Sequence, residues 1–219
     1  MLSIKGNEMI WLIGCKGMLG TELGKQLTDN NISWVGTDSE VDITDQSALD
    51  SFALSHSPSA EMTGSSALNG HVGKKITWII NCSAYTNVDK AESDQDIAAK
   101  LNTEGPLHIA RTARRINAKL IHISTDYVYD GKSSVPYTEE MPFSPINAYG
   151  KTKADGENAI HKEMTQYYIL RTSWLYGFTG NDNDGWTYII RSNTHDLKAE
   201  SKAINERLIK SKSDSEQIF

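Results

Sequence analysis

The sequence predicts an α/β protein built on a doubly wound parallel sheet with helices on both faces. Short apolar runs rich in isoleucine and valine alternate with stretches of helical periodicity, which is the pattern of βαβ units. These runs are apolar almost throughout, as expected of strands buried on both faces of a parallel sheet. The first run also ends in a glycine cluster that leads into a helix, as the first turn of doubly wound folds does.

The elements of the first half follow from apolar runs and helical spacing. The first three strands are predicted at residues 9–14, 32–38 and 76–84. The helix after the first strand is predicted from apolar residues at helical spacing, namely Met18, Leu19, Leu23 and Leu27.

The second half continues the alternation. Residues 96–118 have helical periodicity and predict one helix. Strands are predicted at 119–124 and 167–177, with a helix at 149–161 between them.

Two stretches do not fit this rhythm. Residues 54–75 are rich in serine and glycine and predict a flexible polar insertion before the third strand. From Gly180 the alternation of strands and helices is lost. An amphipathic helix is predicted there at residues 197–209, followed by a polar tail that frays.

Composition narrows the function classes. The net charge of -6 argues against a surface for nucleic acid or anionic membranes. No apolar run approaches the roughly 20 residues that span a bilayer, and the opening residues lack a signal-peptide pattern. Cys15 and Cys82 each adjoin an apolar run, so we expect free thiols in the reducing cytoplasm. The six histidines are scattered without ligand spacing, so no metal site is predicted.

The glycine cluster "GCKGMLG" predicts a Rossmann-like turn that binds the pyrophosphate of a dinucleotide. Gly14 permits the tight turn, Gly17 lets the backbone approach the pyrophosphate, and Gly20 lets the helix pack on the strand. The helix N-terminus offers free N–H groups to the phosphates. The alternative is a purely structural glycine turn, and Lys16 is either a phosphate contact or a solvated lysine. The cofactor-binding residues expected here are Gly14, Lys16, Gly17, Met18, Leu19 and Gly20.

Asp38 follows the second strand and bears on the choice of cofactor. A carboxylate there accepts hydrogen bonds from a ribose 2′-OH and repels a 2′-phosphate, which favours NAD(H) and leaves NADP(H) as the alternative. Glu40 and Asp42 compete for this role. Asp42 and Ile43 are also placed to contact the adenine ring.

A second group of residues predicts proton transfer. Ser124 and Thr125 end a strand, and the carboxyl edge of the sheet is where doubly wound folds bind ligands. Tyr149 and Lys153 share one helix face at i and i+4. An ammonium near a phenol lowers the tyrosine pKa, so Tyr149 is the expected proton donor, with Thr125 holding a substrate carbonyl. Lys153 is also placed to anchor the nicotinamide ribose.

Together these motifs resemble the extended short-chain dehydrogenase/reductase family, most closely its dTDP-4-dehydrorhamnose reductases. The resemblance covers about Met9 to Gly177. It rests, in order, on "GCKGMLG", "VDITD", "NCSAYTNVDKAE", "LNTEG", "STDYVYDG", "PINAYGKTKADGE" and "LRTSWLYG". From Gly180 the chain departs from the family pattern. We therefore expect a cofactor-binding domain at 1–177 and a reduced substrate region or tail at 178–219.

The resemblance implies a function and further site residues. The implied function is NAD(P)H-dependent reduction of a 4-keto deoxysugar nucleotide. The substrate is then a nucleotide sugar, the expected location is the cytoplasm, and a homodimer is the oligomeric state considered. Thr125, Tyr149 and Lys153 would be the catalytic set. The resemblance adds as cofactor-lining residues Ser83, Ala84, Tyr85, Asn102 and Thr172, with Asn102 also bracing the active-site helix.

The residues after Thr125 separate close relatives. Related dehydratases carry Thr-Asp-Glu, whereas this chain has Thr125, Asp126 and Tyr127 and lacks the eliminating acid. Two alternatives stay open. One is a non-catalytic regulatory protein of the same fold, similar to the regulatory subunit of methionine adenosyltransferase. The other is an extended-family epimerase or oxidoreductase with another substrate.

Overall fold

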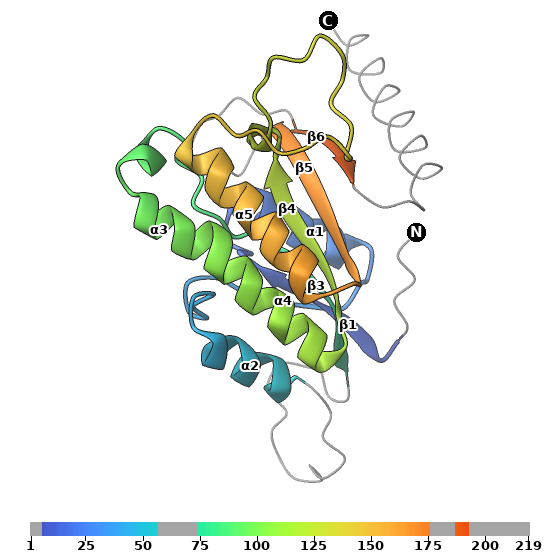
Figure 1. Cartoon of the computed structure of the whole chain (residues 1–219). Coiled ribbons are helices and arrows are strands. Elements are labelled where there is room, and N and C mark those ends of the chain that lie inside the picture. Colours follow the sequence, from blue (N-terminus) through green and yellow to red (C-terminus); the bar gives the residue numbers. More distant parts are fainter. Residues whose placement is uncertain (1–5, 57–73, 176–186, 193–219) are drawn as a thin grey trace, which may run out of the picture.

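A computed structural model describes residues 6–56, 74–175 and 187–192. Within these residues the chain forms one six-stranded sheet in the order β2-β1-β3-β4-β5-β6 (Figure 1). The strands are β1 (Glu8–Ile13), β2 (Trp34–Thr37), β3 (Lys75–Asn81), β4 (Lys119–Thr125), β5 (Tyr167–Leu175) and β6 (Thr187–Ser192). Strands β1 to β5 are parallel and β6 is antiparallel to β5. The predicted doubly wound α/β class is confirmed.

Helices cover both faces of this sheet (Figure 1). Helix α1 (Met18–Asp29) lies on one face, where Leu27 packs with Ile10 and Leu12. Helices α2 (Gln46–Ser55), α4 (Gly105–Ile116) and α5 (Ala148–Glu163) lie on the other. Their apolar residues join Trp11 in the larger core cluster. Because β1 is central, its alternate side chains enter the two cores, and every residue of the strand after Glu8 is apolar.

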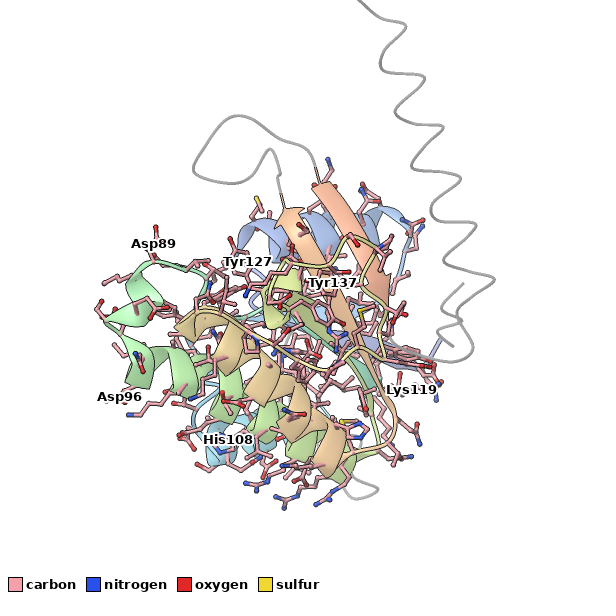
Figure 2. All side chains as sticks on the ribbon, turned by 45° about the horizontal axis from the view of Figure 1, so that its top comes forward. Asp89, Asp96, His108, Lys119, Tyr127 and Tyr137 are labelled. Atoms are coloured by element: carbon pink, nitrogen blue, oxygen red, sulfur yellow. The ribbon has the colours of Figure 1, made fainter. Side chains whose placement is uncertain are left out.

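The strand order places a crevice between β1 and β3. The chain leaves β1 toward β2 on one side, while β3 pairs with the other side of β1. Ile13 is level with Thr37 on β2 and Asn81 on β3, so three strands end together. Lys119 is the first residue of β4, and Tyr127 lies just after its last residue (Figure 2). The carboxyl end of β4 is therefore the end next to Tyr127. Ligands of doubly wound sheets bind at this reversal of strand order, at the carboxyl edge.

Helix α2 was not predicted from the sequence. Its N-cap Asp45 accepts hydrogen bonds from the N–H groups of Ser47 and Ala48, which satisfies two free donors of the first turn. Leu49 and Ala53 are fully buried against the core. The predicted insertion at 54–75 therefore overlaps the end of a helix, and most of it lies outside the described residues.

The helix predicted at 96–118 is interrupted. The structure has α3 (Gln95–Ala99), a π-helical turn (Lys100–Glu104), and then α4. Pro106 lies in the first turn of α4, directly after the π-helical turn. The wide turn brings Asn102 against α5, where a Cβ on Gly156 would lie 2.1 Å from the Asn102 carbonyl oxygen. A turn of this kind inside a helix often marks a functional site.

The sheet gains an edge strand beyond the predicted alternation. Strand β6 pairs with β5, with Ser192 opposite Leu170 and Thr187 opposite Leu175. No strand was predicted in this stretch, because its polar, glycine-rich surroundings conceal a short run of β-prone residues. The helix predicted at 197–209 lies outside the described residues. Among the described helices, none is long and apolar enough to cross a membrane.

Candidate active site

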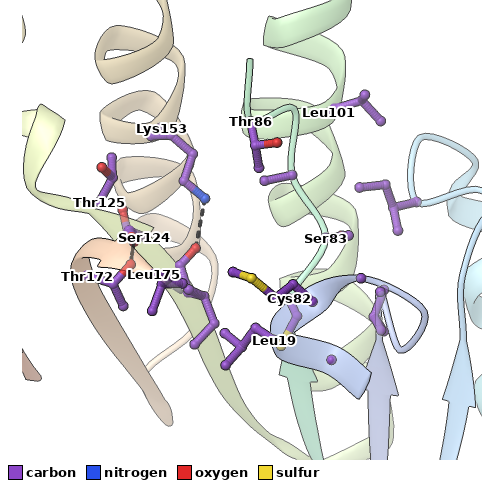
Figure 3. Close-up of a pocket in the computed structure, with 18 of the residues that line it drawn as sticks. Leu19, Cys82, Ser83, Thr86, Leu101, Ser124, Thr125, Lys153, Thr172 and Leu175 are labelled. Carbon is purple, nitrogen blue, oxygen red and sulfur yellow. Dashed lines mark hydrogen bonds between the residues drawn. The ribbon is translucent and has the colours of Figure 1, made fainter. Parts of the chain in front are cut away.

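A cavity of about 850 Å³ opens at the carboxyl edge of the sheet. Its walls come from the β1–α1 turn, the segment after β2, the ends of β3, β4 and β5, and the start of α5 (Figure 3). The predicted residues that line it are Gly14, Gly17, Met18, Leu19, Gly20, Asp38, Asp42, Ile43, Ser83, Ala84, Ser124, Thr125, Tyr149, Lys153 and Thr172. Three predicted residues are not among the lining residues: Lys16, Tyr85 and Asn102.

The glycines of the β1–α1 turn have different steric surroundings. Gly14 has a φ of +77°, which side-chain-bearing residues rarely adopt. A Cβ on Gly20 would lie 2.1 Å from the Gly14 carbonyl oxygen, so the helix start packs directly on the turn. A Cβ on Gly17 would only touch that oxygen at 3.4 Å, so internal packing does not require this glycine. Gly17 lines the cavity at the N-cap of α1, which fits close approach by a phosphate.

Asp38 lies at the cavity wall and orders the neighbouring loop. Its Oδ2 accepts the backbone N–H of Lys16 at 3.1 Å, and its Oδ1 accepts the N–H of Ser39 at 2.9 Å. The Lys16 ammonium instead contacts Glu40 at 2.9 Å, on the exposed surface. That contact holds the pKa of Glu40 at about 2. Thus Asp38 faces the cavity, while Lys16 and Glu40 pair outside it.

Tyr149 and Thr125 both line the cavity, with their side chains within hydrogen-bond reach of each other. Tyr149 lies in the first turn of α5, whose N-cap Asn147 accepts the N–H of Gly150 at 2.7 Å. Burial raises the pKa of Tyr149, a hydrogen bond with the Thr125 side chain opposes this, and Asp126 adds to the rise. The predicted lowering of this pKa is therefore not found. The reason is that burial of the phenol dominates, while the neighbouring amine is directed elsewhere.

The Lys153 amine points from α5 toward β4 (Figure 3). Its Nζ donates to the carbonyl of Ile123 at 2.7 Å and lies 3.4 Å from Nε2 of His122. Lys153 is 2% exposed, and burial lowers its pKa to about 8 against the opposing effects of Glu157 and Cys82. The amine thus lies at the cavity wall with its charge disfavoured.

Asn102 and Tyr85 support the wall from behind. Oδ1 of Asn102 accepts the N–H of Tyr85 at 2.9 Å, and its Nδ2 donates to the Tyr85 carbonyl at 3.1 Å and to Thr152 Oγ1 at 3.2 Å. The Tyr85 hydroxyl donates to Asp94. The fully buried Asn102 therefore joins the segment after β3 to helix α5, as a brace would.

A buried network fixes α5 against the sheet. Glu157 accepts hydrogen bonds from Ser124 Oγ at 2.5 Å and from Arg171 Nη2 at 2.6 Å. Arg171 Nη1 also donates to the hydroxyl of Tyr129 at 2.5 Å. Sequence reasoning missed this network. An available signal was the arginine inside the apolar run "YYILRTSWL", because a charge buried in a strand needs a partner.

Other lining residues were also missed. They are mainly small or apolar residues next to the predicted ones: Ile13, Ser39, Val41, Cys82, Thr86, Val88, Leu101, Ile123, Asp126, Tyr127 and Leu175. Most of them lie at or after the carboxyl ends of strands β1 to β5, which was the available signal. In ranges 6–56, 74–175 and 187–192, no three His, Cys, Asp or Glu side chains gather as metal ligands would.

The sequence matches the family described as "RmlD substrate binding domain" over residues 8–199, which extends past the Gly177 limit of the predicted resemblance. It is 40% identical over 176 residues to a probable dTDP-4,6-dihydroxy-2-methyloxan-3-one 4-ketoreductase of Streptomyces antibioticus, covering 78% of this chain and 53% of that protein. It is 37% identical over 174 residues to a dTDP-4-dehydrorhamnose reductase of Streptomyces griseus, covering 78% and 51%.

A solved structure gives the same picture. The dTDP-4-dehydrorhamnose reductase of Bacillus anthracis, in complex with NADP, superposes with a TM-score of 0.69 at 33% identity, covering 80% of this chain and 57% of that one. The chain thus spans about half the length of the curated relatives it matches. On the family match over most of its length, the chain belongs to the RmlD substrate binding domain family and is similar to dTDP-4-dehydrorhamnose reductases.

Proposed function

We propose that this chain binds a nicotinamide dinucleotide and reduces the 4-keto group of a deoxysugar nucleotide. The observation that carries this function is the meeting of Thr125, Tyr149 and Lys153 in the same cavity as the glycine turn. The named relatives that act on dTDP-4-keto sugars support the substrate class.

The residues present fit a dinucleotide. Gly17 leaves its cavity side open at the N-terminus of α1, where N–H groups and the helix dipole favour a pyrophosphate. Asp38 marks the position for the adenosine ribose. The bound dinucleotide would supply a hydride to the carbonyl carbon.

The protein side of the reaction is proton transfer and orientation. Thr125 would hold the substrate oxygen, and Tyr149 would donate its hydroxyl proton to that oxygen as the carbonyl becomes an alcohol. The raised pKa of Tyr149 keeps the phenol protonated and ready to donate. Lys153 would anchor the nicotinamide ribose. One ketone, one hydride and one proton thus give one alcohol.

Reduction fits the cavity better than dehydration. Asp126 and Tyr127 line the wall directly after Thr125, and no glutamate occupies the position of Tyr127. A phenol there cannot serve as the carboxylate base of an elimination at neutral pH.

We further propose that NAD(H) binds at least as well as NADP(H). The carboxylate of Asp38 at the cavity wall supports this, because it would repel a 2′-phosphate. The Bacillus anthracis relative is in complex with NADP, so the choice of dinucleotide has to be measured in this chain. Cytoplasmic location, a homodimer and a substrate-binding role for residues 178–219 stay predictions.

The test is calorimetric titration with NADH and NADPH, followed by oxidation of NADH in the presence of dTDP-4-keto-6-deoxysugars. Binding with turnover is expected. Tight binding without turnover would instead favour a regulatory protein, and absence of binding would refute the proposed function.

A further inference from the structure

Behind the Lys153 amine, three polar residues form a chain that reaches back to the end of β3. His122, on β4, is fully buried, and its Nε2 lies 3.4 Å from Lys153 Nζ. Its Nδ1 lies 3.0 Å from Nδ2 of Asn81, which is also fully buried. The Oδ1 of Asn81 meets the backbone N–H of Ser83 at 3.0 Å and the Ser83 hydroxyl at 2.6 Å.

The backbone N–H of Ser83 determines which atoms donate and which accept along this series of hydrogen bonds. A backbone N–H only donates, so the Asn81 atom facing Ser83 is the carbonyl oxygen and the amide NH₂ faces His122. The amide NH₂ also only donates, so His122 Nδ1 must accept. Burial and the nearby Lys153 lower the pKa of His122 well below its usual value, so the ring is neutral. Its single proton then lies on Nε2, which faces Lys153.

This arrangement distinguishes the two forms of the lysine. A neutral amine has a lone pair that accepts from the Nε2–H while one of its protons goes to the Ile123 carbonyl. An ammonium has three protons and no acceptor, so it would place donor against donor at His122.

The other titratable groups around the Lys153 amine do not account for a preference for its neutral form. Glu157, on α5, is paired with Arg171 at 2.6 Å, so its charge is largely offset. Burial raises the pKa of the Cys82 thiol, at the end of β3, to about 12, so the thiol is neutral. Burial raises the pKa of Tyr149, one turn earlier on α5, so this phenol is neutral.

We propose that the chain Ser83–Asn81–His122 holds the imidazole in its Nε2–H tautomer and thereby stabilises the neutral amine of Lys153. His122 is in this sense a positioning residue. Its importance for catalysis rests on the proposed function, in which Lys153 would anchor the nicotinamide ribose.

The test uses the protein without dinucleotide and needs no turnover. The ¹⁵N shifts of the His122 ring give the tautomer directly, and the ¹³Cε shift of Lys153 follows its protonation between pH 6 and 10.5. The Lys153 signal is assigned by its loss in Lys153→Met. We expect a proton on Nε2 and none on Nδ1. A proton on Nδ1 in the wild type would overturn the proposal.

Two variants separate this role from simple packing. His122→Phe keeps a ring but removes the donor, so the protonation constant of Lys153 should rise about three- to tenfold, the usual effect of one buried hydrogen bond. His108→Phe is the matched control, since this half-buried histidine on α4 contacts the Ile43 carbonyl instead, and it should leave the Lys153 signal unmoved. An unmoved Lys153 titration in a folded His122→Phe protein would refute the role.

Should His122→Phe fail to fold, Asn81→Asp supplies the same test. A carboxylate only accepts, so the His122 proton should move to Nδ1. A tautomer that stays on Nε2 would show that Asn81 does not set it. These measurements do not depend on whether the protein reduces a sugar. Failure of the turnover assay and failure of the proposed role of His122 are therefore distinguishable.

Discussion

Arg171 on β5 and Glu157 on α5 form a buried ion pair behind the cavity, with Arg171 Nη2 2.6 Å from Glu157 Oε2 and Nε 3.1 Å from both carboxylate oxygens. The two residues are 9% and 2% exposed. Helix α5 carries Tyr149 and Lys153, so this pair fixes the elements that carry the proposed chemistry.

Removing one partner of this pair should destabilise the fold strongly. For Arg171→Met we expect the free energy of unfolding to fall by about 3–5 kcal/mol, because Glu157 is left charged and buried. Urea denaturation followed by circular dichroism measures this loss. Arg115→Gln breaks a pair with Asp50 in which the arginine side chain is 59% exposed, and should cost no more than about 1 kcal/mol. Equal losses in both variants would contradict the structural role of the buried pair.

Tyr149→Phe should slow reduction without weakening dinucleotide binding. The variant removes the proposed proton donor, and general acid catalysis typically supplies about 10²- to 10⁴-fold. The glycine turn is untouched, so the Kd for NADH should hold. Steady-state turnover and calorimetry measure the two effects.

The control for Tyr149 is Tyr127→Phe. Tyr127 also lines the cavity, and its ring meets that of Tyr149 edge-on at 5.6 Å between centroids. The Tyr127→Phe variant should keep most of the activity. Near-wild-type turnover in Tyr149→Phe would show that the phenol is not the donor.

Gly17→Ala should fold normally but bind dinucleotide poorly. Its Cβ would make an ordinary contact of 3.4 Å within the protein, yet it would occupy the space proposed for the pyrophosphate. Gly20→Ala should instead destabilise the fold, since its Cβ would lie 2.1 Å from the Gly14 carbonyl oxygen. Thermal unfolding and NADH titration of both variants separate the two cases. Unchanged NADH affinity in Gly17→Ala would rule out the proposed phosphate position.

Asp38→Ala should narrow the difference in affinity between NADH and NADPH. The variant removes the carboxylate proposed to repel a 2′-phosphate. Glu40→Ala is the comparison, because Glu40 pairs with Lys16 and is absent from the cavity wall. Calorimetry with both dinucleotides gives the ratio. Should only Glu40→Ala change it, the assignment of Asp38 would be wrong.

Lys153 should make stability rise with pH just above neutrality. Its pKa is lowered from 10.5 to about 8, so between these values the unfolded chain binds more protons than the folded one. The buried ammonium of Lys153 therefore destabilises the folded protein most below pH 8, and this destabilisation decreases as the pH rises. Relative to Lys153→Met, the wild type should gain roughly 1 kcal/mol between pH 8 and 9.

The measurement is urea unfolding of both proteins at pH 8, 8.5 and 9. The Cys82 thiol, whose pKa is raised from 9.0 to about 12, works in the opposite direction as the unfolded thiol ionises, and it does so in both proteins, so the difference between them reports Lys153. A difference between the two proteins that does not change with pH would show that Lys153 is not perturbed.

The parts of the fold predicted from sequence are those with strong local periodicity. Strand β1 is apolar after Glu8 because it is central, and the glycine turn follows it directly. Helix α2 was missed because its signal was a capping residue, Asp45, rather than a long apolar pattern. The π turn at Lys100–Glu104 was missed because helical periodicity changes little when one residue is added to one turn.

The candidate site divides in a similar way. Tyr149 and Lys153 are four apart on one helix, so their common face follows from sequence. The direction of the Lys153 amine does not, because it depends on His122 and Ile123 from another strand. The same holds for Tyr149, whose pKa is set by burial that no local pattern reveals.

Because of the π turn at Lys100–Glu104, the insertion or deletion of a single residue in this segment would change the position of Asn102. Deleting one residue there would close the wide turn into a regular α-helix, so Asn102 would no longer be held where the wide turn places it. Asn102 would then leave Thr152, and α5 would lose the contact that ties it to the segment after β3. The turn therefore ties the position of α5 to the length of the segment that carries Asn102, and not only to the identity of that residue.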